Sequence, residues 1–386
     1  MATQFDLHNF LPRHIRKMLH AKTATSSKHS GAFNVLALDK NESAWGTVGT
    51  DSDYSKYPDS EATLLRKELS EYLKISSDKI MLGNGSDELI DLIMRVFTQN
   101  GKDHVLAFSP YAARVKHFAA LNGLVVDEMH LNTAFQLSIF QVRNHINEHT
   151  KIMYISNPNP FSGICLRGMD MVDIIGDFNG LVIVDESCIG YQPENSLIEY
   201  IESYPNLVIV QSFSNVWGMA GLRLGVLFAS PQIVEVLNKV RAPFNVNSMA
   251  QEIAVKALHI AEQKDRIVNE TILERERLKD ELLQLKFVQE VFNSDANYLL
   301  VRVDKPDHLI EYLDDERIYV YNATAHHNCS NCVRITVGSV EQNQRLIKTL
   351  REMASKTAPA RMFLKKLGQT LQRASVFLGF FKKIVG

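Results

Sequence analysis

The stretch Ser212-Phe-Ser-Asn-Val-Trp-Gly-Met-Ala-Gly-Leu-Arg-Leu-Gly225 carries the most information about the fold. Two serines close an apolar run that begins at Leu207, a glycine-rich bend follows, and Arg223 stands among apolar residues. Burying an arginine without a partner is costly, so an arginine in such surroundings usually pairs with an anion. The stretch therefore predicts a strand that ends at an anion site. The alternative is a structural ion pair between Arg223 and a nearby carboxylate.

Two other segments have the same character. Met81-Leu-Gly-Asn-Gly-Ser-Asp-Glu-Leu-Ile90 is a turn rich in glycine and asparagine that leads directly into a helix. The free N–H groups of a helix N-terminus bind phosphate, and glycines let the backbone approach the ligand, although an ordinary capped helix start would look alike. Val182-Ile-Val-Asp-Glu-Ser187 places an acidic pair at the carboxyl end of a buried strand, where open α/β sheets bind ligands. A helix cap or a core ion pair is the alternative there.

Around these segments, apolar runs alternate with amphipathic patterns such as Glu61–Leu73 and Asp87–Thr98. Most of the runs are continuously apolar, as are the buried strands of a mostly parallel sheet. The rhythm predicts a doubly wound α/β domain. The expected strands are Val105–Ser109, Val125–Leu131, Lys151–Ser156, Leu181–Ser187, Leu207–Ser214 and Leu222–Ser230.

The C-terminal part follows a different pattern. A helical pattern from Met249 to Leu285 precedes three strand-like segments, Phe287–Val303, Ile318–Tyr321 and Cys332–Val337, and a covering helix, Val340–Met353. We expect an N-terminal arm, a large domain, a smaller α+β domain on which the helical part of the arm (Leu11–His20) packs, and a tail. The expected boundaries are residues 1–45, 46–255, 256–356 and 357–386.

In this order, the segments resemble the fold-type-I pyridoxal-phosphate-dependent aminotransferases, and most closely the histidinol-phosphate aminotransferase group. The resemblance spans about residues 8–355 and also rests on Leu38-Asp-Lys-Asn-Glu42, Lys56-Tyr-Pro-Asp59 and Cys332-Val-Arg-Ile-Thr-Val-Gly338. It implies an α/β large domain with a mixed, mostly parallel sheet and a smaller α+β C-terminal domain.

The resemblance also implies a role for each matching residue. Asp185 would pair with the pyridine nitrogen of the cofactor and make its ring an electron sink. Arg334 would clamp the substrate carboxylate, and Asn41 would lie near the substrate. Tyr57 would reach the phosphate of a neighbouring subunit. The remaining phosphate ligands would be the backbone N–H groups of Gly85, Ser86 and Asp87 together with Ser212, Ser214 and Arg223.

The family pattern breaks at its nucleophile. The family motif Ser-Lys-x-x-Gly is Ser214-Asn215-Val216-Trp217-Gly218 in this chain. The lysine of the motif forms a Schiff base with the cofactor and then carries the substrate proton, and asparagine can do neither. The nearest lysines along the chain are Lys151 and Lys239.

Three further residues differ from the family pattern, at positions that the resemblance places around the cofactor ring. Pro160 replaces an asparagine that would donate to the phenolic oxygen, and Cys188 replaces a tyrosine that shares this oxygen. Ala112 stands where a tyrosine would stack on the ring, unless a one-residue gap places Tyr111 there. Groups that would bind phosphate and substrate are kept, while groups around the reacting part of the ring are changed together.

Three hypotheses follow. The main one is a pseudo-aminotransferase that cannot form the Schiff base. It would hold pyridoxal phosphate or pyridoxamine phosphate non-covalently, if at all, and act by binding or as a dimer partner, in a homodimer or beside an active relative. The second is a lysine-independent enzyme acting on an amino-acid-like, histidinol-phosphate-like substrate. The third is a binding module recruited to membranes by the tail.

The tail is basic and amphipathic. Lys356 to Gly386 contain seven Lys/Arg and no Asp/Glu; subtracting these from the overall net charge of −2 leaves −9 for the other residues. Apolar residues from Leu364 to Val385 recur at three- and four-residue steps, so residues 361–386 predict a helix that binds a membrane surface or a protein partner. A helix docked on the protein's own surface is the alternative.

The bulk composition of the 386 residues limits the other classes. A net charge of −2 provides no field that would attract nucleic acid. Four cysteines do not make a disulfide framework in a chain of this length, and neither a signal peptide nor an apolar run of about 18 residues is evident, so we expect a cytoplasmic protein. The spacing in His326-His-Asn-Cys-Ser-Asn-Cys332 suits a metal site, but we expect no bound metal because a second ligand pair is not evident.

Overall fold

The computed structural model describes residues 5–19, 36 and 38–355. The predicted amphipathic tail, residues 361–386, lies outside the described residues. Within them, no helix is both long and apolar enough to cross a membrane.

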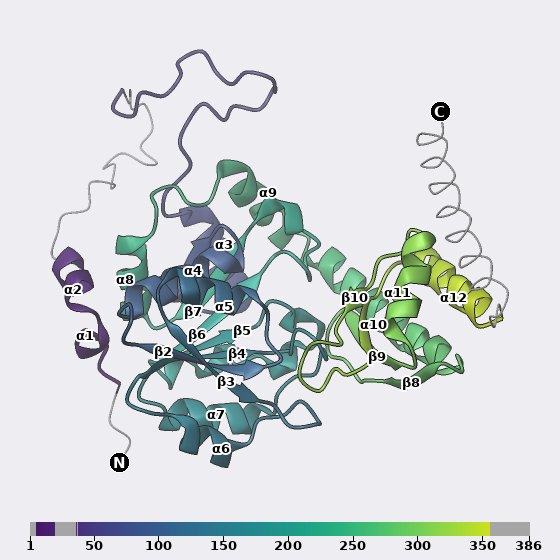
Figure 1. Cartoon of the computed structure of the whole chain (residues 1–386). Coiled ribbons are helices and arrows are strands. Elements are labelled where there is room, and N and C mark those ends of the chain that lie inside the picture. Colours follow the sequence, from purple (N-terminus) through teal and green to yellow (C-terminus); the bar gives the residue numbers. More distant parts are fainter. Residues whose placement is uncertain (1–4, 20–35, 37, 356–386) are drawn as a thin grey trace, which may run out of the picture.

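The larger part of the protein is built on a mixed, mostly parallel sheet (Figure 1). Its strand order is β1-β7-β6-β5-β4-β2-β3, and β7 runs antiparallel to both of its neighbours while the other neighbouring pairs are parallel. The six predicted strands of this part are confirmed. The sheet also contains Ile80–Gly83, which is too short to show a pattern in the sequence. The strands are β1 (Ile80–Gly83), β2 (His104–Ser109), β3 (Val125–His130), β4 (Thr150–Ser156), β5 (Leu181–Asp185), β6 (Leu207–Ser212) and β7 (Gly225–Ala229).

Helices cover both faces of this sheet. Successive strand residues point to opposite faces, so Ile152 packs in one core cluster with α4, α5 and α8, whereas Met153 packs in another with α3, α6, α7 and α9. Figure 1 shows α6 and α7 together below the sheet. The helices are α3 (Thr63–Leu73), α4 (Gly85–Phe97), α5 (Arg114–Leu121), α6 (Ile139–His145), α7 (Gly168–Asp177), α8 (Pro231–Val240) and α9 (Ser248–Leu258). Short 3-10 helices are η1 (Ser77–Lys79), η2 (Ile189–Tyr191), η3 (Pro193–Asn195), η4 (Ile198–Glu202) and η5 (Ala220–Leu222).

The N-terminal arm packs against the part of the protein that contains the large sheet. Its helices α1 (Leu7–Phe10) and α2 (Arg13–Leu19) bury Phe10 and Ile15 in the core cluster of α4 and α8, and the rings of Phe10 and Phe97 are 6.3 Å apart. Figure 1 shows α1 and α2 far from the small sheet. The prediction that the arm packs on the C-terminal part is therefore wrong, because an apolar stripe does not identify the surface that will bury it.

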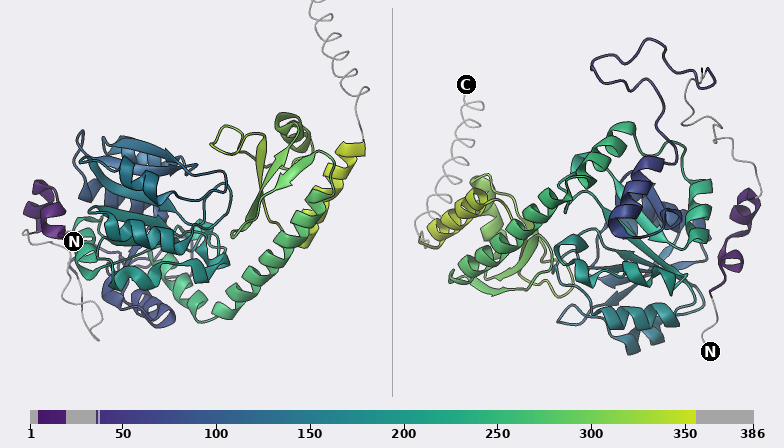
Figure 2. Two further views of the ribbon diagram at one scale, coloured as in Figure 1. Left: turned by 90° about the horizontal axis from the view of Figure 1, so that it is seen from below. Right: turned by 180° about the vertical axis from the view of Figure 1, so that it is seen from behind.

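A four-stranded antiparallel sheet of order β10-β11-β9-β8 forms the C-terminal part and has its own core cluster. The long helix α10 leads into it from the large part (Figure 2). The helical pattern predicted from Met249 to Leu285 breaks at His259 and Ile260 into α9 and α10, and the segment Phe287–Val303 forms two strands. The elements are α10 (Ala261–Leu283), β8 (Val288–Val291), β9 (Tyr298–Val303), α11 (Pro306–Asp315), β10 (Tyr321–Asn322), β11 (Cys332–Thr336) and α12 (Val340–Ser355).

Candidate functional site

Sheet register brings the first two glycine-containing segments together. Gly225, the first residue of β7, is paired with Gly83 on one side and with Ser212 on the other. A Cβ at Gly225 would lie 2.5 Å from the carbonyl carbon of Gly85, so the start of β7 packs backbone to backbone on the turn before α4. The N-terminus of α4 and the end of β6 therefore lie next to each other.

Arg223 covers this turn. It lies in the left-handed region (φ +52°) directly after η5, and its guanidinium is so near Gly85 that an added Cβ would come within 2.6 Å of Nη2. Arg223 Nη2 is 3.3 Å from the Asp87 carboxylate, and about half of the Arg223 side chain is exposed. Ser212 Oγ accepts a hydrogen bond from the Ser214 N–H at 3.0 Å. We call the set Gly85, Ser86, Asp87, Ser212, Ser214 and Arg223 the cradle.

Asp185 ends β5 and is buried, with both carboxylate oxygens engaged. Ser187 donates to Oδ1 from its hydroxyl and its N–H, while Tyr154 and Arg114 donate to Oδ2. Burial alone would raise the pKa of Asp185, but the Arg114 charge and these donors outweigh it and hold the pKa below its usual value. Asp185 is therefore an ionised carboxylate whose counter-ion is Arg114.

Arg114 connects Asp185 to the cradle. Its Nε lies 3.5 Å from Asp87 Oδ1, so Asp87 stands between the two guanidinium groups of Arg114 and Arg223. Arg114 and Tyr154 are not among the residues that the sequence predicted for this site. Like Arg223, Arg114 stands among apolar residues, after two alanines and before a valine, and this is a signal for a charge that needs a partner. Tyr154 is a polar residue inside the apolar run of β4.

Asn215 is exposed and lies beside Cys188. Its side-chain amide Nδ2 is 3.1 Å from Cys188 Sγ, and its carbonyl accepts from the Tyr191 hydroxyl at 3.4 Å. Burial and then the nearby Asp185 raise the pKa of the Cys188 thiol to about 11, so the thiol is neutral at ordinary pH. The predicted neighbours of the ring position, Asn215, Cys188 and Asp185, therefore do lie together.

Ala112 and Tyr111 are the two candidates for the residue that would stack on the ring. Tyr111 is buried in the core cluster of α4 and α8, where its hydroxyl donates to Glu128 at 3.1 Å. The choice between Ala112 and Tyr111 as the residue that stacks on the ring stays a prediction. Arg114, two residues beyond Ala112, contacts Asp185.

Arg334 on β11 is held by aromatic rings. Its guanidinium carbon lies 4.6 Å from the ring centre of Tyr321, 5.2 Å from that of Tyr298 and 5.7 Å from that of Phe161. Its Nη1 donates to the carbonyl of Pro160, in the loop after β4. Cation–π contacts and this hydrogen bond hold the guanidinium, and no carboxylate in the described part of the chain forms a salt bridge with it.

Asn41 and Tyr57 lie elsewhere. Both line an open cavity of about 720 Å³ with Phe244 and Asn247, and the Tyr57 ring stacks on Phe244 at 4.8 Å. Tyr57 is 54% exposed. The structure thus brings Asn41 to Tyr57 and not to the predicted substrate clamp Arg334. In Figure 1 the loop of residues 38–58 extends away from the large sheet.

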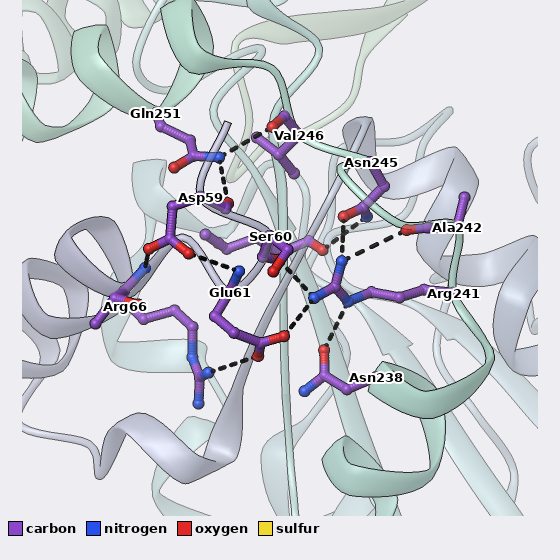
Figure 3. A network of polar contacts seen from close by, with 12 residues as sticks. Asp59, Ser60, Glu61, Arg66, Asn238, Arg241, Ala242, Asn245, Val246 and Gln251 are labelled. Carbon is purple, nitrogen blue, oxygen red and sulfur yellow. Dashed lines mark hydrogen bonds and ion pairs between the residues drawn. The ribbon is translucent and has the colours of Figure 1, made fainter. Parts of the chain in front are cut away.

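A network centred on Arg241 holds the segment that directly follows that loop (Figure 3). The buried Arg241 side chain binds Ser60 O, Glu61, Asn238 and Asn245. Asn245 in turn donates to Glu88 Oε2 at 3.0 Å, and the same Glu88 oxygen accepts from the backbone N–H of Asn84, the residue before α4. The first turn of α4 is therefore held from one side by Arg223 and from the other by this network.

The segment from His326 to Cys332 is a compact turn. Cys329 and Cys332 are buried, and the His326 ring lies 3.9 Å from the Phe161 ring. Across the described ranges, no group of three or more His, Cys, Asp or Glu residues could hold a metal ion.

Comparisons with known proteins identify the family of the chain. Residues 26–350 match the family model described as aminotransferase class I and II. The chain is 36% identical over 349 residues to a histidinol-phosphate aminotransferase from Christiangramia forsetii, covering 90% of this chain and 98% of the relative. It is 36% identical over 330 residues to a Bacteroides fragilis histidinol-phosphate aminotransferase, covering 86% and 94% of the two chains.

Solved structures show the same fold. A histidinol-phosphate aminotransferase from Clostridium acetobutylicum superposes with a TM-score of 0.73 at 23% identity, covering 78% of this chain and 91% of the other. One from Sinorhizobium meliloti, solved in complex with pyridoxal-5'-phosphate, has a TM-score of 0.73 at 20% identity and coverages of 83% and 90%. The predicted fold class, a mixed and mostly parallel sheet with a smaller C-terminal sheet, is confirmed.

Proposed function

The chain belongs to the class I and II aminotransferase family, and on that premise we propose that it is a pseudo-aminotransferase of the histidinol-phosphate aminotransferase type. It keeps an anion-binding cradle but lacks the groups that act on a cofactor ring. It works by binding a phosphorylated or amino-acid-like ligand, or as the partner of another subunit.

The phosphate end of pyridoxal phosphate fits the cradle. The N-terminus of the 13-residue helix α4 offers free N–H groups, and Arg223 supplies a charge whose side chain still reaches solvent. A Cβ at Gly85 would collide with the Arg223 guanidinium, so the glycine lets this charge lie directly against the turn. Ser212 and Ser214 add donors at the end of β6.

The surroundings of Asp185 do not fit the ring of pyridoxal phosphate. In the resemblance, Asp185 binds the pyridine nitrogen, but here its two oxygens already accept four hydrogen bonds, one of them from the positive Arg114. Asn215 offers no amine, and among the described residues no lysine contacts Asp185. The Arg114–Asp185 ion pair beside Asn215 is the observation that carries the proposal. Pyridoxal phosphate or pyridoxamine phosphate, if held, is held through its phosphate and non-covalently.

Calorimetric titration with inorganic phosphate and with pyridoxal phosphate tests this proposal. We expect the two affinities to agree within about tenfold, because the ring adds little, and Arg223→Ala to weaken both about tenfold or more. Arg95→Ala, which removes an exposed arginine from the far end of α4, is the matched control and should change neither. Amino transfer between an amino acid and a 2-oxo acid at rates normal for the family would contradict the proposal.

A lysine-independent enzyme is the second candidate, and Arg334 favours it. Its guanidinium is fixed by aromatic rings and keeps donors for a substrate carboxylate. Such an enzyme would take an amino-acid-like, histidinol-phosphate-like substrate. If turnover is found, Arg334→Ala and Asp185→Asn should each abolish it; turnover that survives both would exclude this site.

We also propose that the chain forms a dimer through the loop of residues 38–58, as a homodimer or with an active relative. Trp45 and Val48 in this loop are 97% and 99% exposed, which is unusual for two large apolar side chains so close in sequence. In a mixed dimer, Tyr57 would serve the phosphate of the neighbouring site.

The membrane-recruited module is the third candidate, and it rests on the sequence of residues 361–386 alone. Deleting residues 357–386 should release the protein from anionic vesicles if the tail binds them. Failure of the full-length protein to bind such vesicles would end this candidate and favour a protein partner or a docked helix.

A further inference from the structure

A second cavity of about 220 Å³ lies behind the candidate site. It is enclosed by α3, the segment after β5, the end of β6, β7 and the start of α10. Ser187 and Ser212 form the wall that it shares with the candidate site, whereas Arg114, Asp185 and Arg223 do not line it. Its apolar lining includes Leu69, Leu73, Ile189, Ile198, Val226 and Phe228.

One side of this cavity combines aromatic rings with a cation. The Trp217 ring stacks on Phe213 at 5.0 Å and meets Tyr72 edge-on at 5.9 Å. Lys264 Nζ lies 5.4 Å from the Trp217 ring centre and 5.7 Å from that of Tyr72. Tyr72 is 38% exposed while Phe213 is buried, so these residues run from solvent to the interior.

Lys264 has capacity for another partner. An ammonium group has three donors, and within the described part of the chain Lys264 uses two of them, toward the Tyr72 hydroxyl at 3.0 Å and the exposed Asp265 at 2.7 Å. A cationic ligand would be repelled here, because Lys264 already occupies the faces of both rings. An anion would complete the set of partners.

The volume limits the ligand. An engineered cavity of roughly 150 Å³ admits benzene, whereas drug-sized ligands need roughly 300 Å³ or more. About 220 Å³ therefore suits one aromatic ring with a short substituent. We propose that this cavity binds a small aryl carboxylate, with the ring against Trp217 and Phe213 and the carboxylate on Lys264. This site adjoins the cradle through Ser212, but its ligand contacts neither Arg223 nor Asp185, and the proposal does not depend on the proposed function.

Tryptophan fluorescence provides the test. The chain has two tryptophans, and Trp45 is exposed in the distant loop, so Trp45→Phe leaves Trp217 as the sole reporter. Phenylacetate should give a saturable change in the full-length Trp45→Phe protein and bind about tenfold tighter than the neutral benzyl alcohol. Adding Lys264→Met should remove that preference and keep the binding of benzyl alcohol. Adding Ile198→Phe, which fills the cavity, should weaken both.

Three results would overturn the proposal. These are no saturable response to either probe, an unchanged preference for phenylacetate in both Lys264→Met and Lys264→Gln, and displacement of phenylacetate by inorganic phosphate, which would place the probe in the cradle. Circular dichroism of each variant confirms that it folds. Because Lys264 and Ile198 are only partly buried, these substitutions leave the main core intact.

Discussion

The proposed function rests on the ion pair between Asp185 and Arg114. Breaking a buried ion pair leaves an unpaired charge and costs about 3–5 kcal/mol, and partial exposure of Arg114 reduces this to about 2 kcal/mol. Arg114→Ala should therefore lower the free energy of unfolding by about 2 kcal/mol in urea. Asp185→Asn combined with Arg114→Ala should cost less than the sum of the two single changes. A loss below about 0.5 kcal/mol in Arg114→Ala would show that the pair is not formed.

Glu186 follows Asp185, and its burial leads us to expect that the free energy of unfolding depends on pH. Its carboxyl group is buried, and burial raises its pKa to about 7 although Ser196, Leu197 and Gln211 donate to it. A raised folded-state pKa contributes stability that is complete below about pH 4.5 and is lost as the pH rises through about 7, since the unfolded chain releases this proton first. The loss between about pH 5 and pH 8 should be about 3 kcal/mol.

The check is chemical unfolding at several pH values. The free energy of unfolding should fall with pH over this range in the natural chain. In Glu186→Gln this slope should be largely absent, whatever the absolute stability of that variant. Equal slopes in the two proteins would assign the pH dependence to other groups.

At the residue scale, the sequence predicted the cradle better than the ring site. Gly85, Ser212 and Arg223 belong to segments whose glycines and strand ends are visible in the sequence. Arg114 and Asp185 are 71 residues apart along the chain, and their contact depends on where the N-terminus of α5 lies against β5. No local pattern encodes that position. The roles of all these residues in binding stay predictions.

At the element scale, the first turn of α4 depends on the Arg241 network. Arg241 is 6% exposed in its side chain and binds five neighbours with a planar fork that lysine cannot reproduce. Arg241→Ala and Arg241→Lys should each lower the free energy of unfolding by about 2–3 kcal/mol and weaken phosphate binding.

Lys239, two residues away on α8, supplies the control. It forms an exposed pair with Glu235, so Lys239→Ala should cost less than about 0.5 kcal/mol and leave phosphate affinity unchanged. Urea unfolding and phosphate calorimetry measure both effects. An Arg241→Ala variant with unaltered phosphate affinity would show that the network does not position α4.

The bounds of helices and strands were predicted well where a long run of residues is apolar and buried. The continuously apolar strands β4 to β6 were found within a few residues, because a buried strand has no polar face. The break between α9 and α10 was not found, since His259 and Ile260 are compatible with a helix and the bend arises from packing. The domain boundaries expected near residues 45, 255 and 356 stay predictions.

At the scale of the whole molecule, the loop of residues 38–58 carries the prediction about assembly. Large central side chains account for most of the binding energy of an interface, so Trp45→Asp or Val48→Asp should raise the dimer dissociation constant at least about tenfold. Phe140→Asp on α6, which also exposes a large apolar side chain, is the control and should change nothing. Analytical ultracentrifugation compares them; a natural chain that is monomeric at high concentration would refute the proposed dimer.

The central claim is that the protein cannot link covalently to pyridoxal phosphate in the cradle. Borohydride converts a lysine–aldehyde link into a stable bond, so mass spectrometry after reduction locates any attached pyridoxyl group. In the natural chain we expect no pyridoxyl attachment that inorganic phosphate prevents. In Asn215→Lys we expect attachment at residue 215, and inorganic phosphate should prevent it. Stoichiometric attachment to a single lysine of the natural chain, prevented by inorganic phosphate, would contradict it.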